Sequence, residues 1–538
     1  MWFMSLSKNL NTDCNGAGFV VYKYFPFVLL TLLVLTSCAS LPPNINAPKT
    51  YALQDTNDTK FAKKSRLLIE KSNNESGFFL LSNSLDAYTA RIAIIRHAER
   101  SIDAQYYMIH NDLTGILFGE QLIKAADRGI RVRLLLDDMD LADRDEGLAT
   151  VASHPNISIR VFNPFIRSFR SRTSQFLTQF GSVTRRMHNK SLTIDNQITI
   201  VGGRNIGDEY FDADPYLAFA DLDILAIGPV VKEVSASFDE YWNSALAYPI
   251  EILRPDITGE ESYAEGIEAL EQYVNRDEVY AYKKRIVGSG LFKNLQNNTV
   301  SYSRGTATVL SDHPDKLTGY DTDSSLILIS QFNQYLKLLK TEFIIFSPYF
   351  VPGKTGTELL SNLSKNGIRV RILTNSLAST DVGIVHAGYA KYRTTLLRAG
   401  VELYEMNKVL SREKHEEKRG TYGSSKASLH AKSFVLDRKN VFIGSLNLDP
   451  RSIVENTEIG IMVSSEDLAE EMVSGFDYIS KNLAFRLELI TDDNGIEHIR
   501  WHGLEKGAGK TWNSDPYTSA WQRFCIFILG LMPIESQL

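Results

Sequence analysis

The sequence is poor in cysteine, and this excludes two common ways of stabilising a fold. Its 538 residues include only Cys14, Cys38 and Cys525. None of them stands in a CxxC pair or in a cluster with histidine, so the sequence predicts neither a zinc site nor a disulfide framework. We expect a protein that carries no metal and no cofactor.

The sequence also lacks an excess of positive charge. Lysine and arginine number 58 and aspartate and glutamate 64, which gives a net charge of −6. Proteins that bind nucleic acid over a broad surface are normally basic, so we expect no nucleic-acid partner. The hydrophobic fraction of 43% is that of a globular protein. A chain of this length is larger than a typical domain with a single hydrophobic core, so we predict two domains or one large pseudo-symmetric unit.

No hydrophobic run is long enough to cross a membrane. The longest candidate, FPFVLLTLLVL at 25–35, falls short of the ~20 residues of a membrane span but matches the apolar part of a signal peptide. It ends in Leu-Thr-Ser-Cys38, which resembles a bacterial lipobox. We therefore expect a lipoprotein signal peptide at 1–38, with an ordinary signal peptide or an uncleaved anchor as alternatives.

Lipidation of Cys38 would attach the mature protein to a membrane on its periplasmic side. The sequence does not decide between the inner and the outer membrane. The stretch that follows, 39–74, is rich in proline, asparagine and lysine. This composition predicts a tether between the anchor and the folded protein.

The chain contains an internal repeat. GIRVRL at 129–134 returns as GIRVRIL at 367–373, an offset of 238 residues. HNKSLTID at 188–195 returns as HAKSFVLD at 430–437, an offset of 242 residues. Two landmarks with nearly equal offsets indicate a duplicated unit.

Each copy alternates β-branched segments with helical ones, which indicates an α/β lobe. Helices are predicted at 113–128 and 357–366, and Gly129 and Gly367 suit the left-handed position that ends a helix. We expect a first lobe at 75–250, a connection at 251–300, a second lobe at 301–505 and an apolar C-terminal tail at 506–538.

The repeated motif carries the candidate chemistry. On a strand, residues i and i+2 point the same way, so His188 shares a face with Lys190, and His430 with Lys432. An ammonium fixed beside an imidazole suits a phosphate group. A glycine and an asparagine follow each motif at matched distance, Gly202 and Asn205 in the first copy and Gly444 and Asn447 in the second.

These motifs resemble those of the phospholipase D superfamily, in which HxKxxxxD is followed by GSxN. The resemblance is closest to bacterial cardiolipin synthases of the C-type branch, through MHNKSLTIDNQITIVGGRNIGDEYF (187–211), LHAKSFVLDRKNVFIGSLNLDPRS (429–452) and SPYFVP (347–352). It implies two pseudo-symmetric α/β/α lobes packed around one central active site. One departure is visible, because Gly203 stands where the motif has serine, while Ser445 keeps it.

The resemblance also implies the roles of the site residues. His188 is expected to attack phosphorus and form a phosphohistidine, and His430 to act as the general acid and base. Since one imidazole must be neutral while the other is charged, they should titrate as a coupled pair. The developing charge would be stabilised without a metal by Lys190, Lys432, Asn205, Asn447 and Ser445.

Four carboxylates belong to the candidate site. Asp195 and Asp437 complete the two motifs, but their odd offset of seven residues turns them away from the histidines and favours a structural role. Asp223 and Glu458, placed after each motif, are candidates to orient the histidines by hydrogen bonding.

The leading functional hypothesis is a phosphatidyltransferase that makes cardiolipin from phosphatidylglycerol and a second phospholipid, either phosphatidylglycerol or phosphatidylethanolamine. The alternatives are a phospholipase D-type hydrolase of lipid or nucleic acid, and a scaffold lipoprotein without activity. A membrane surface is an expected partner. Basic and aromatic residues alternate at 166–190, which suits an anionic lipid surface, single-stranded nucleic acid or a solvated loop. The apolar segment 524–532 would either lie in the membrane interface or cover the core.

Overall fold

The computed structural model of the protein describes residues 41, 44, 47–69, 75–142, 144–167, 184–214, 217–255, 260–297, 299–318, 323–408 and 426–532. The predicted signal peptide with Cys38 lies outside the described residues, and so does most of the basic segment, at 168–183.

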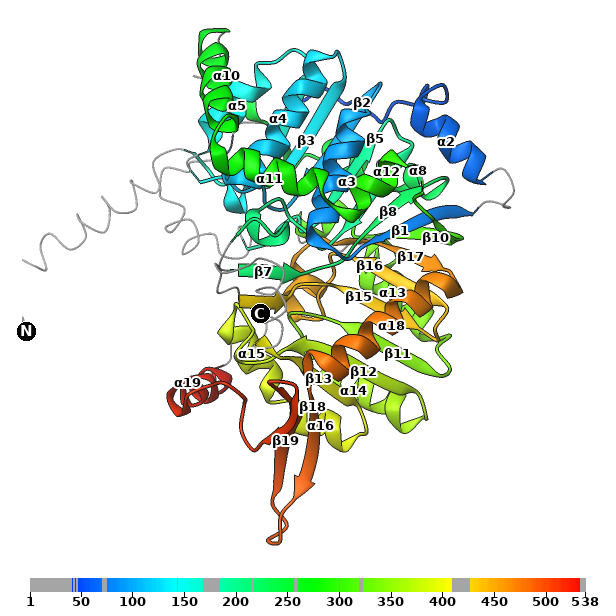
Figure 1. The fold of residues 1–538 in the computed structure, drawn as a ribbon, viewed down its shortest axis with the longest axis vertical. Coiled ribbons are helices and arrows are strands. Elements are labelled where there is room, and N and C mark those ends of the chain that lie inside the picture. The colour runs from blue at the N-terminus through cyan, green and yellow to red at the C-terminus, as the bar shows by residue number, and fades with distance from the viewer. Residues whose placement is uncertain are drawn as a thin grey trace, which may run out of the picture.

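The first lobe is a mixed sheet with helices on both faces, as the repeat predicts (Figure 1). Its strands are β1 (Ser76–Leu81), β2 (Ser101–Tyr106), β3 (Arg131–Asp137), β4 (Ile157–Phe162), β5 (Ser191–Ile194), β6 (Ile198–Gly202), β8 (Asp223–Ile227) and β9 (Ala247–Pro249). Its helices are α3 (Ser84–Arg96), α4 (Leu113–Asp127), α5 (Asp145–Ala152), α8 (Val230–Trp242) and α9 (Ile250–Leu253).

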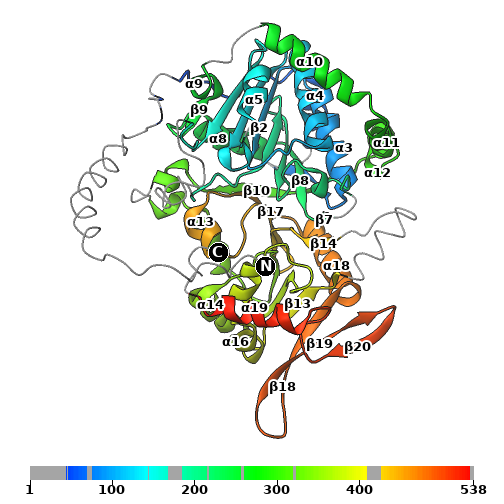
Figure 2. The ribbon, with the colours of Figure 1, turned by 90° about the vertical axis from the view of Figure 1, so that its left-hand side faces the viewer.

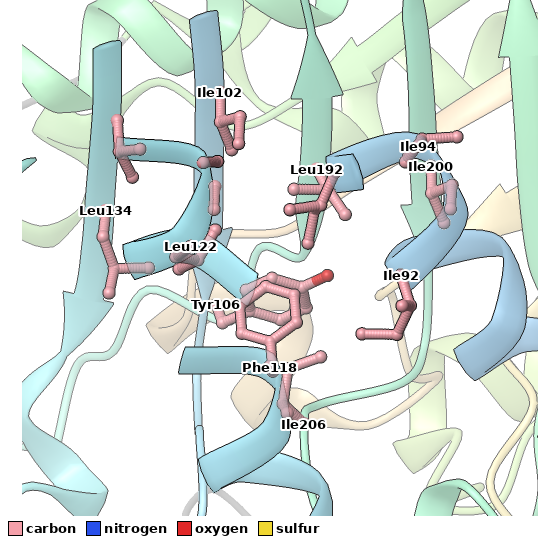
Figure 3. Packing of buried hydrophobic residues seen from close by; sticks show 14 of the residues in the cluster. Ile92, Ile94, Ile102, Tyr106, Phe118, Leu122, Leu134, Leu192, Ile200 and Ile206 are labelled. Carbon is pink, nitrogen blue, oxygen red and sulfur yellow. The ribbon is translucent and has the colours of Figure 1, made fainter. Parts of the chain in front are cut away.

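Both faces of this sheet are covered by helices, but the face toward α8 also carries buried charged residues such as Asp103 of β2 and Arg133 of β3. On β3, Leu134 packs in the cluster under α3 and α4, while Leu135 packs with Trp242 of α8 on the other face. Figure 3 shows the first cluster, in which Ile92 of α3 and Phe118 of α4 meet the strand side chains.

The second lobe repeats this plan. Its strands are β10 (Ser303–Ser311), β11 (Glu342–Phe346), β12 (Arg369–Asn375), β13 (Glu402–Met406), β15 (Ser433–Leu436), β16 (Asn440–Gly444), β17 (Ile459–Ser464), β18 (Ala484–Thr491), β19 (Glu497–Glu505) and β20 (Ala508–Trp512). Its helices are α13 (Leu328–Leu336), α14 (Gly353–Lys365), α15 (Gly383–Ala390), α16 (Arg393–Arg398) and α18 (Glu466–Asn482). As predicted, Gly129 and Gly367 follow α4 and α14 with φ of 83° and 88°.

One sheet of 18 strands runs through both lobes. Strand pairs follow each other in the order β9-β4-β3-β2-β5-β6-β8-β1-β10-β17-β16-β15-β11-β12-β13-β18-β19-β20. The order from β4 to β1 mirrors the order from β10 to β13, so the antiparallel pair β1–β10 joins two matching halves. A second sheet, β7 (Leu217–Ala220) with β14 (Lys426–Leu429), also spans the lobes.

The segments outside the lobes pack more closely than their composition predicts. The expected connection forms α10 (Glu260–Val274), α11 (Asp277–Val287) and α12 (Gly290–Gln296), which lie on the helices of the first lobe. Residues 47–69 of the expected tether include α2 (Lys60–Ile69) and also dock there. Ala52, for example, donates its backbone N–H to Asp239 of α8 at 2.8 Å. A polar composition predicted solvent contact, but the polar groups are paired with the lobe.

The predicted boundary between the second lobe and the C-terminal tail lies too early in the chain. The sheet continues through β19 and β20, so the second lobe extends to Trp512. The tail then forms α19 (Ala520–Gly530), in which no residue is buried, so it does not cover the core. Among the described residues, no helix has the length and apolar character needed to cross a membrane.

Candidate active site

The two motif histidines lie where the lobes meet, and each motif has the same local geometry. The Lys190 ammonium donates to the carbonyl of His188 at 2.6 Å, and the Lys432 ammonium donates to the carbonyl of His430 at 2.7 Å. Both lysines and both histidines are buried. In the second copy the Lys432 ammonium also lies 3.1 Å from Nδ1 and 3.2 Å from Nε2 of His430, as expected for side chains that share one face. Both His-x-Lys stretches precede the strands β5 and β15 instead of lying within them.

Each histidine is held by the backbone of the opposite lobe. The His188 N–H donates to the Thr457 carbonyl at 2.9 Å, and the His430 N–H donates to the Ala220 carbonyl at 2.8 Å. Ala220 ends β7, whose pairing with β14 brings the first lobe to the residue before His430. The reciprocal contacts place both motifs at the boundary between the lobes, where Figure 1 shows β7.

The opposite lobe also supplies the carboxylate behind each imidazole. Glu458 lies 2.8 Å from His188 Nδ1, and Asp221 lies 2.5 Å from His430 Nδ1. In each case the carboxylate residue directly follows the one whose carbonyl accepts the histidine N–H. Each imidazole thus presents its Nε2 as the atom available for chemistry.

The prediction that Asp223 orients a histidine is wrong, because Asp221 has this position. Asp223 is buried between two arginines, accepting from Arg91 at 2.9 Å and Arg204 at 3.0 Å. The strand register shows why the pattern misled. Asp223 pairs with the motif glycine Gly202, just as Gly460 pairs with Gly444, so the residue equivalent to Glu458 stands two positions before Asp223. An alignment anchored on the paired strand residues would have identified Asp221.

The predicted phosphate contact of Ser445 is also wrong. Its hydroxyl proton goes to Glu458, and its oxygen accepts from the Ile459 N–H at 3.0 Å, so the group supports the carboxylate. The counterpart Gly203 has a matching explanation, since a Cβ there would stand 2.3 Å from an oxygen of Asp221. The departure from the GSxN pattern therefore makes room for the carboxylate of the first lobe.

The two motif asparagines are buried at the same junction. The Asn205 amide donates to the Tyr210 hydroxyl at 2.9 Å. The side-chain carbonyl oxygens of Asn205 and Asn447 are buried and have no hydrogen-bond partner among the described residues. A buried acceptor without a partner is costly, so these oxygens suit a hydroxyl of the substrate. Donation from the two amides to phosphate stays a prediction.

Asp195 and Asp437 complete the motifs but lie away from the catalytic junction, so they are not catalytic residues, and their contacts agree with the structural role that their odd offset predicts. Asp195 accepts backbone N–H groups of Glu99, Arg100 and Ser101 at the start of β2. Asp437 accepts three equivalent groups at the start of β11. The strand β5 runs between His188 and Asp195, and its first residue, Ser191, pairs with Gln105 near the far end of β2. Asp195 and His188 therefore lie beyond opposite ends of β5.

Replacing Asp195 by alanine is expected to destabilise the protein without removing its chemistry. Three N–H groups at the start of β2, of which that of Ser101 is buried, would lose their acceptor, at a cost of about 2–4 kcal/mol in the free energy of unfolding. Urea unfolding of both proteins measures this cost. The folded fraction of the variant should keep the native turnover number, and a large loss of turnover in fully folded protein would contradict the structural role.

The electrostatic environments of the two histidines differ. Burial lowers the pKa of His188 well below its usual value, and the charges of Lys190, Lys432 and His430 lower it further. Burial and Lys432 also lower the pKa of His430, but Asp221 opposes them. The charges of His430 and Lys432 reach His188, as expected for two motifs that face one site.

The two carboxylates differ in the same sense. Burial raises the pKa of Glu458 to about 7, against the charge of Lys190. Burial opposes ionisation of Asp221 too, but His430 and Lys432 hold the pKa of that carboxyl well below its usual range. His430 therefore has a permanent anion behind it, whereas His188 has a group that changes its charge near neutral pH.

The rate of transfer should rise with pH through an apparent pKa of about 7. Below it Glu458 is protonated and neutral, and above it the anion accepts the Nδ1 proton of His188 and makes the ring a better nucleophile. In a Glu458→Gln variant this rise should disappear and the rate at pH 8 should fall about 10- to 100-fold. Rates measured from pH 5.5 to 8.5 test this, and an unchanged acid limb in the variant would assign it to another group.

Sequence reasoning missed the aromatic wall of the site. The Tyr107 ring meets His188 edge-on with centroids 5.0 Å apart, and Tyr349 meets His430 at 6.3 Å. Tyr210 and Phe219 add two rings at 5.2 and 4.9 Å from His430. A signal for the first pair was present, because Tyr107 and Tyr349 are separated by the same 242 residues as the histidines.

A possible metal-ligand group lies elsewhere. His110, Asp112 and Glu209 have ligand atoms within 4.8 Å of one another among the described residues. Asp112 already serves as the N-cap of α4, accepting from Gly115. The expectation of metal-free chemistry stays a prediction.

Comparisons with known proteins agree with this geometry. A family model described as "Cardiolipin synthase, PLD-like domain" matches residues 92–242 and 333–480. The chain is 39% identical to "Cardiolipin synthase C" of Escherichia coli (strain K12) over 87% of its own length and 97% of that protein. It is 22% identical to "Cardiolipin synthase" of Oceanobacillus iheyensis over 75% and 70% of the two chains. A phosphatidylserine synthase structure from Haemophilus influenzae Rd KW20 shares the fold, with a TM-score of 0.50, 15% identity and coverage of 79% and 92%.

Proposed function

Since the chain belongs to the family of cardiolipin synthases with phospholipase D-like domains, we propose that it is a phosphatidyltransferase that makes cardiolipin. Phosphatidylglycerol is one substrate, and the phosphatidyl donor is a second phosphatidylglycerol or phosphatidylethanolamine. The observation that carries the proposal is the pair of buried imidazoles at one junction, each with a carboxylate of the opposite lobe behind it.

The first step forms a covalent intermediate. Nε2 of neutral His188 attacks the phosphorus of the donor and forms a P–N bond, while the bond to the leaving alkoxide breaks. His430 gives its proton to that alkoxide, so glycerol or ethanolamine leaves with its hydroxyl group protonated. Lys190 and Lys432 stabilise the charge on the phosphoryl oxygens in a buried environment, where their interaction is strong.

The second step reverses the roles. His430, now neutral, takes the proton of a primary hydroxyl of phosphatidylglycerol, and the resulting oxygen attacks phosphorus. The P–N bond breaks and its electron pair returns to Nε2 of His188, which restores both histidines. The permanent anion Asp221 supports the charged state of His430, and the lower pKa of His188 keeps that ring neutral. This difference favours His188 as the nucleophile.

Product analysis tests the function directly. Purified protein is incubated with labelled phosphatidylglycerol alone and together with phosphatidylethanolamine, and lipids are separated by chromatography. We expect labelled cardiolipin together with free glycerol or ethanolamine. Phosphatidic acid as the sole product would instead identify the alternative, a phospholipase D-type hydrolase, and no reaction of any lipid in either mixture would refute both.

We further propose that the enzyme faces the periplasm and is attached to a membrane by lipidation of Cys38. The lipobox-like sequence before Cys38 supports this, and substrates that reside in a bilayer require a membrane surface. Metabolic labelling with a radioactive fatty acid should mark the native protein, and a Cys38→Ser variant that remains labelled would disprove the assignment.

A further inference from the structure

The C-terminal helix α19 exposes an apolar face to solvent. Trp521, Phe527 and Leu531 are 70%, 63% and 68% exposed, and Phe524 and Ile528 are also exposed. At 100° per residue these five side chains fall within a sector of about 120° of the helix surface. Contiguous exposed apolar groups of this size mark an interaction surface.

The opposite face of α19 fixes the helix to the second lobe. Ile526 lies over Gly383 at the start of α15, and Gly530 lies over the Ala387 carbonyl. Ser519 and Gln522 form a capping box that satisfies backbone N–H groups at the N-terminus of the helix. The apolar face is therefore presented outward by a folded helix that packs against α15. Figure 1 shows α19 beside α15, and Figure 2 shows α19 on the second lobe.

The supporting helix α15 leads to the active site. Two residues before it, Asp381 accepts a hydrogen bond from the Tyr349 hydroxyl at 2.6 Å. The ring of Tyr349 borders both His430 and Lys432. A surface bound through α19 is thus connected by one short helix to the wall of the catalytic junction.

The composition of the face fits a lipid bilayer better than a second copy of the chain. Tryptophan and phenylalanine favour the membrane interface, and α19 carries Arg523 but no acidic residue, which suits an anionic lipid surface. A stable homodimer needs about 800 Å² per partner. α19 is about 16 Å long, and one face of such a helix covers only a fraction of this area.

We propose that the apolar face of α19 docks into the surface of a bilayer that contains phosphatidylglycerol and so places the junction of the lobes at the lipid headgroups. The functional reason for this docking rests on the proposed function, because the substrates of that reaction lie in the bilayer. The helix lies in the interface and does not span the membrane.

The position of the helix is measured with an environment-sensitive fluorophore. It is attached to Phe524→Cys in full-length protein whose three native cysteines are replaced by alanine. Tyr280→Cys on α11 of the connection, an even more exposed position, carries the reference label. Vesicles of phosphatidylglycerol should raise the emission and shift it to the blue at position 524 alone. Equal responses at both positions would refute docking. A blue shift at position 524 that appears without vesicles when the protein concentration is raised would also refute it, because that result indicates self-association.

The effect on turnover is measured with a triple variant, Phe524→Asp, Phe527→Asp and Leu531→Asp. Turnover of vesicle-bound phosphatidylglycerol should fall at least roughly tenfold, while turnover of a dispersed short-chain phosphatidylglycerol should stay unchanged. A Leu338→Asp variant, at an equally exposed leucine, should behave as the native protein. Native-like vesicle turnover in the triple variant refutes docking. If the native protein converts neither substrate, the proposed function fails, while the fluorophore still reports docking.

Discussion

A His188→Ala variant should lose phosphatidyl transfer by roughly 10⁴-fold or more and should form no covalent intermediate. The reason is the electrostatic difference between the two rings. His188 combines a strongly lowered pKa with the environment of Lys190 and Lys432, so it is the ring that stays neutral and can attack phosphorus. His430 has the anion of Asp221 behind it and is suited to carry a proton.

Trapping the intermediate distinguishes the two histidines. Native protein is mixed with donor labelled in the phosphate and quenched in base, where phosphohistidine survives, and the labelled peptide is then identified by mass spectrometry. We expect the label on His188. The matched variant His430→Ala should also lose turnover but retain slow labelling at His188, because the nucleophile is intact. Label on His430 in native protein would reverse the assigned roles.

The duplicated architecture could be predicted from the sequence because its determinants are local. A strand–helix–strand order, glycines such as Gly129 and Gly367, and two equally spaced histidine motifs are each visible in a short window. The odd offset of Asp195 from His188 likewise predicted a side chain turned away from the site, which the three backbone contacts confirm. Period-two geometry within one strand is enough for such inferences.

The contacts between the lobes could not be predicted in the same way. Glu458 was selected as the partner of a histidine, but nothing in a local pattern states that it serves His188 across the junction. The choice of Asp223 over Asp221 failed because both follow the motif as acidic residues, and only strand pairing separates them. Ser445 was misassigned because a hydroxyl near a phosphate site suits either role until its proton is placed.

For the segments outside the lobes, amino-acid composition did not predict which residues pack against the fold. Polar residues before residue 69 predicted a solvated tether, yet backbone groups there bind Asp239 and Asn243 of the first lobe. A polar segment forms part of a fold when another element offers matching donors and acceptors, and that match depends on tertiary structure. The apolar tail shows the reverse, since its hydrophobic residues remain exposed in α19.

Replacing Asp221 by asparagine should lower transfer about 10²- to 10³-fold while leaving the fold intact. The amide keeps the size of the side chain but removes the negative charge 2.5 Å from His430 Nδ1. Because Asp221 raises the pKa of His430, its loss lowers that pKa, and the ring gives up its proton at a lower pH. The alkaline limb of the pH–rate profile should therefore move toward acid.

The neighbouring carboxylate provides the control for this variant. Asp223 is of the same residue type, equally buried and two positions away, but its charge pairs with Arg91 and Arg204. Asp223→Asn should weaken a buried ion network and lower the free energy of unfolding by about 3–5 kcal/mol, because two arginines lose their counter-charge. Its folded fraction should keep the native pH profile. If Asp221→Asn only lowers stability while Asp223→Asn shifts the alkaline limb, the carboxylate that orients His430 has been misidentified, and the cross-lobe arrangement does not control the acid–base step.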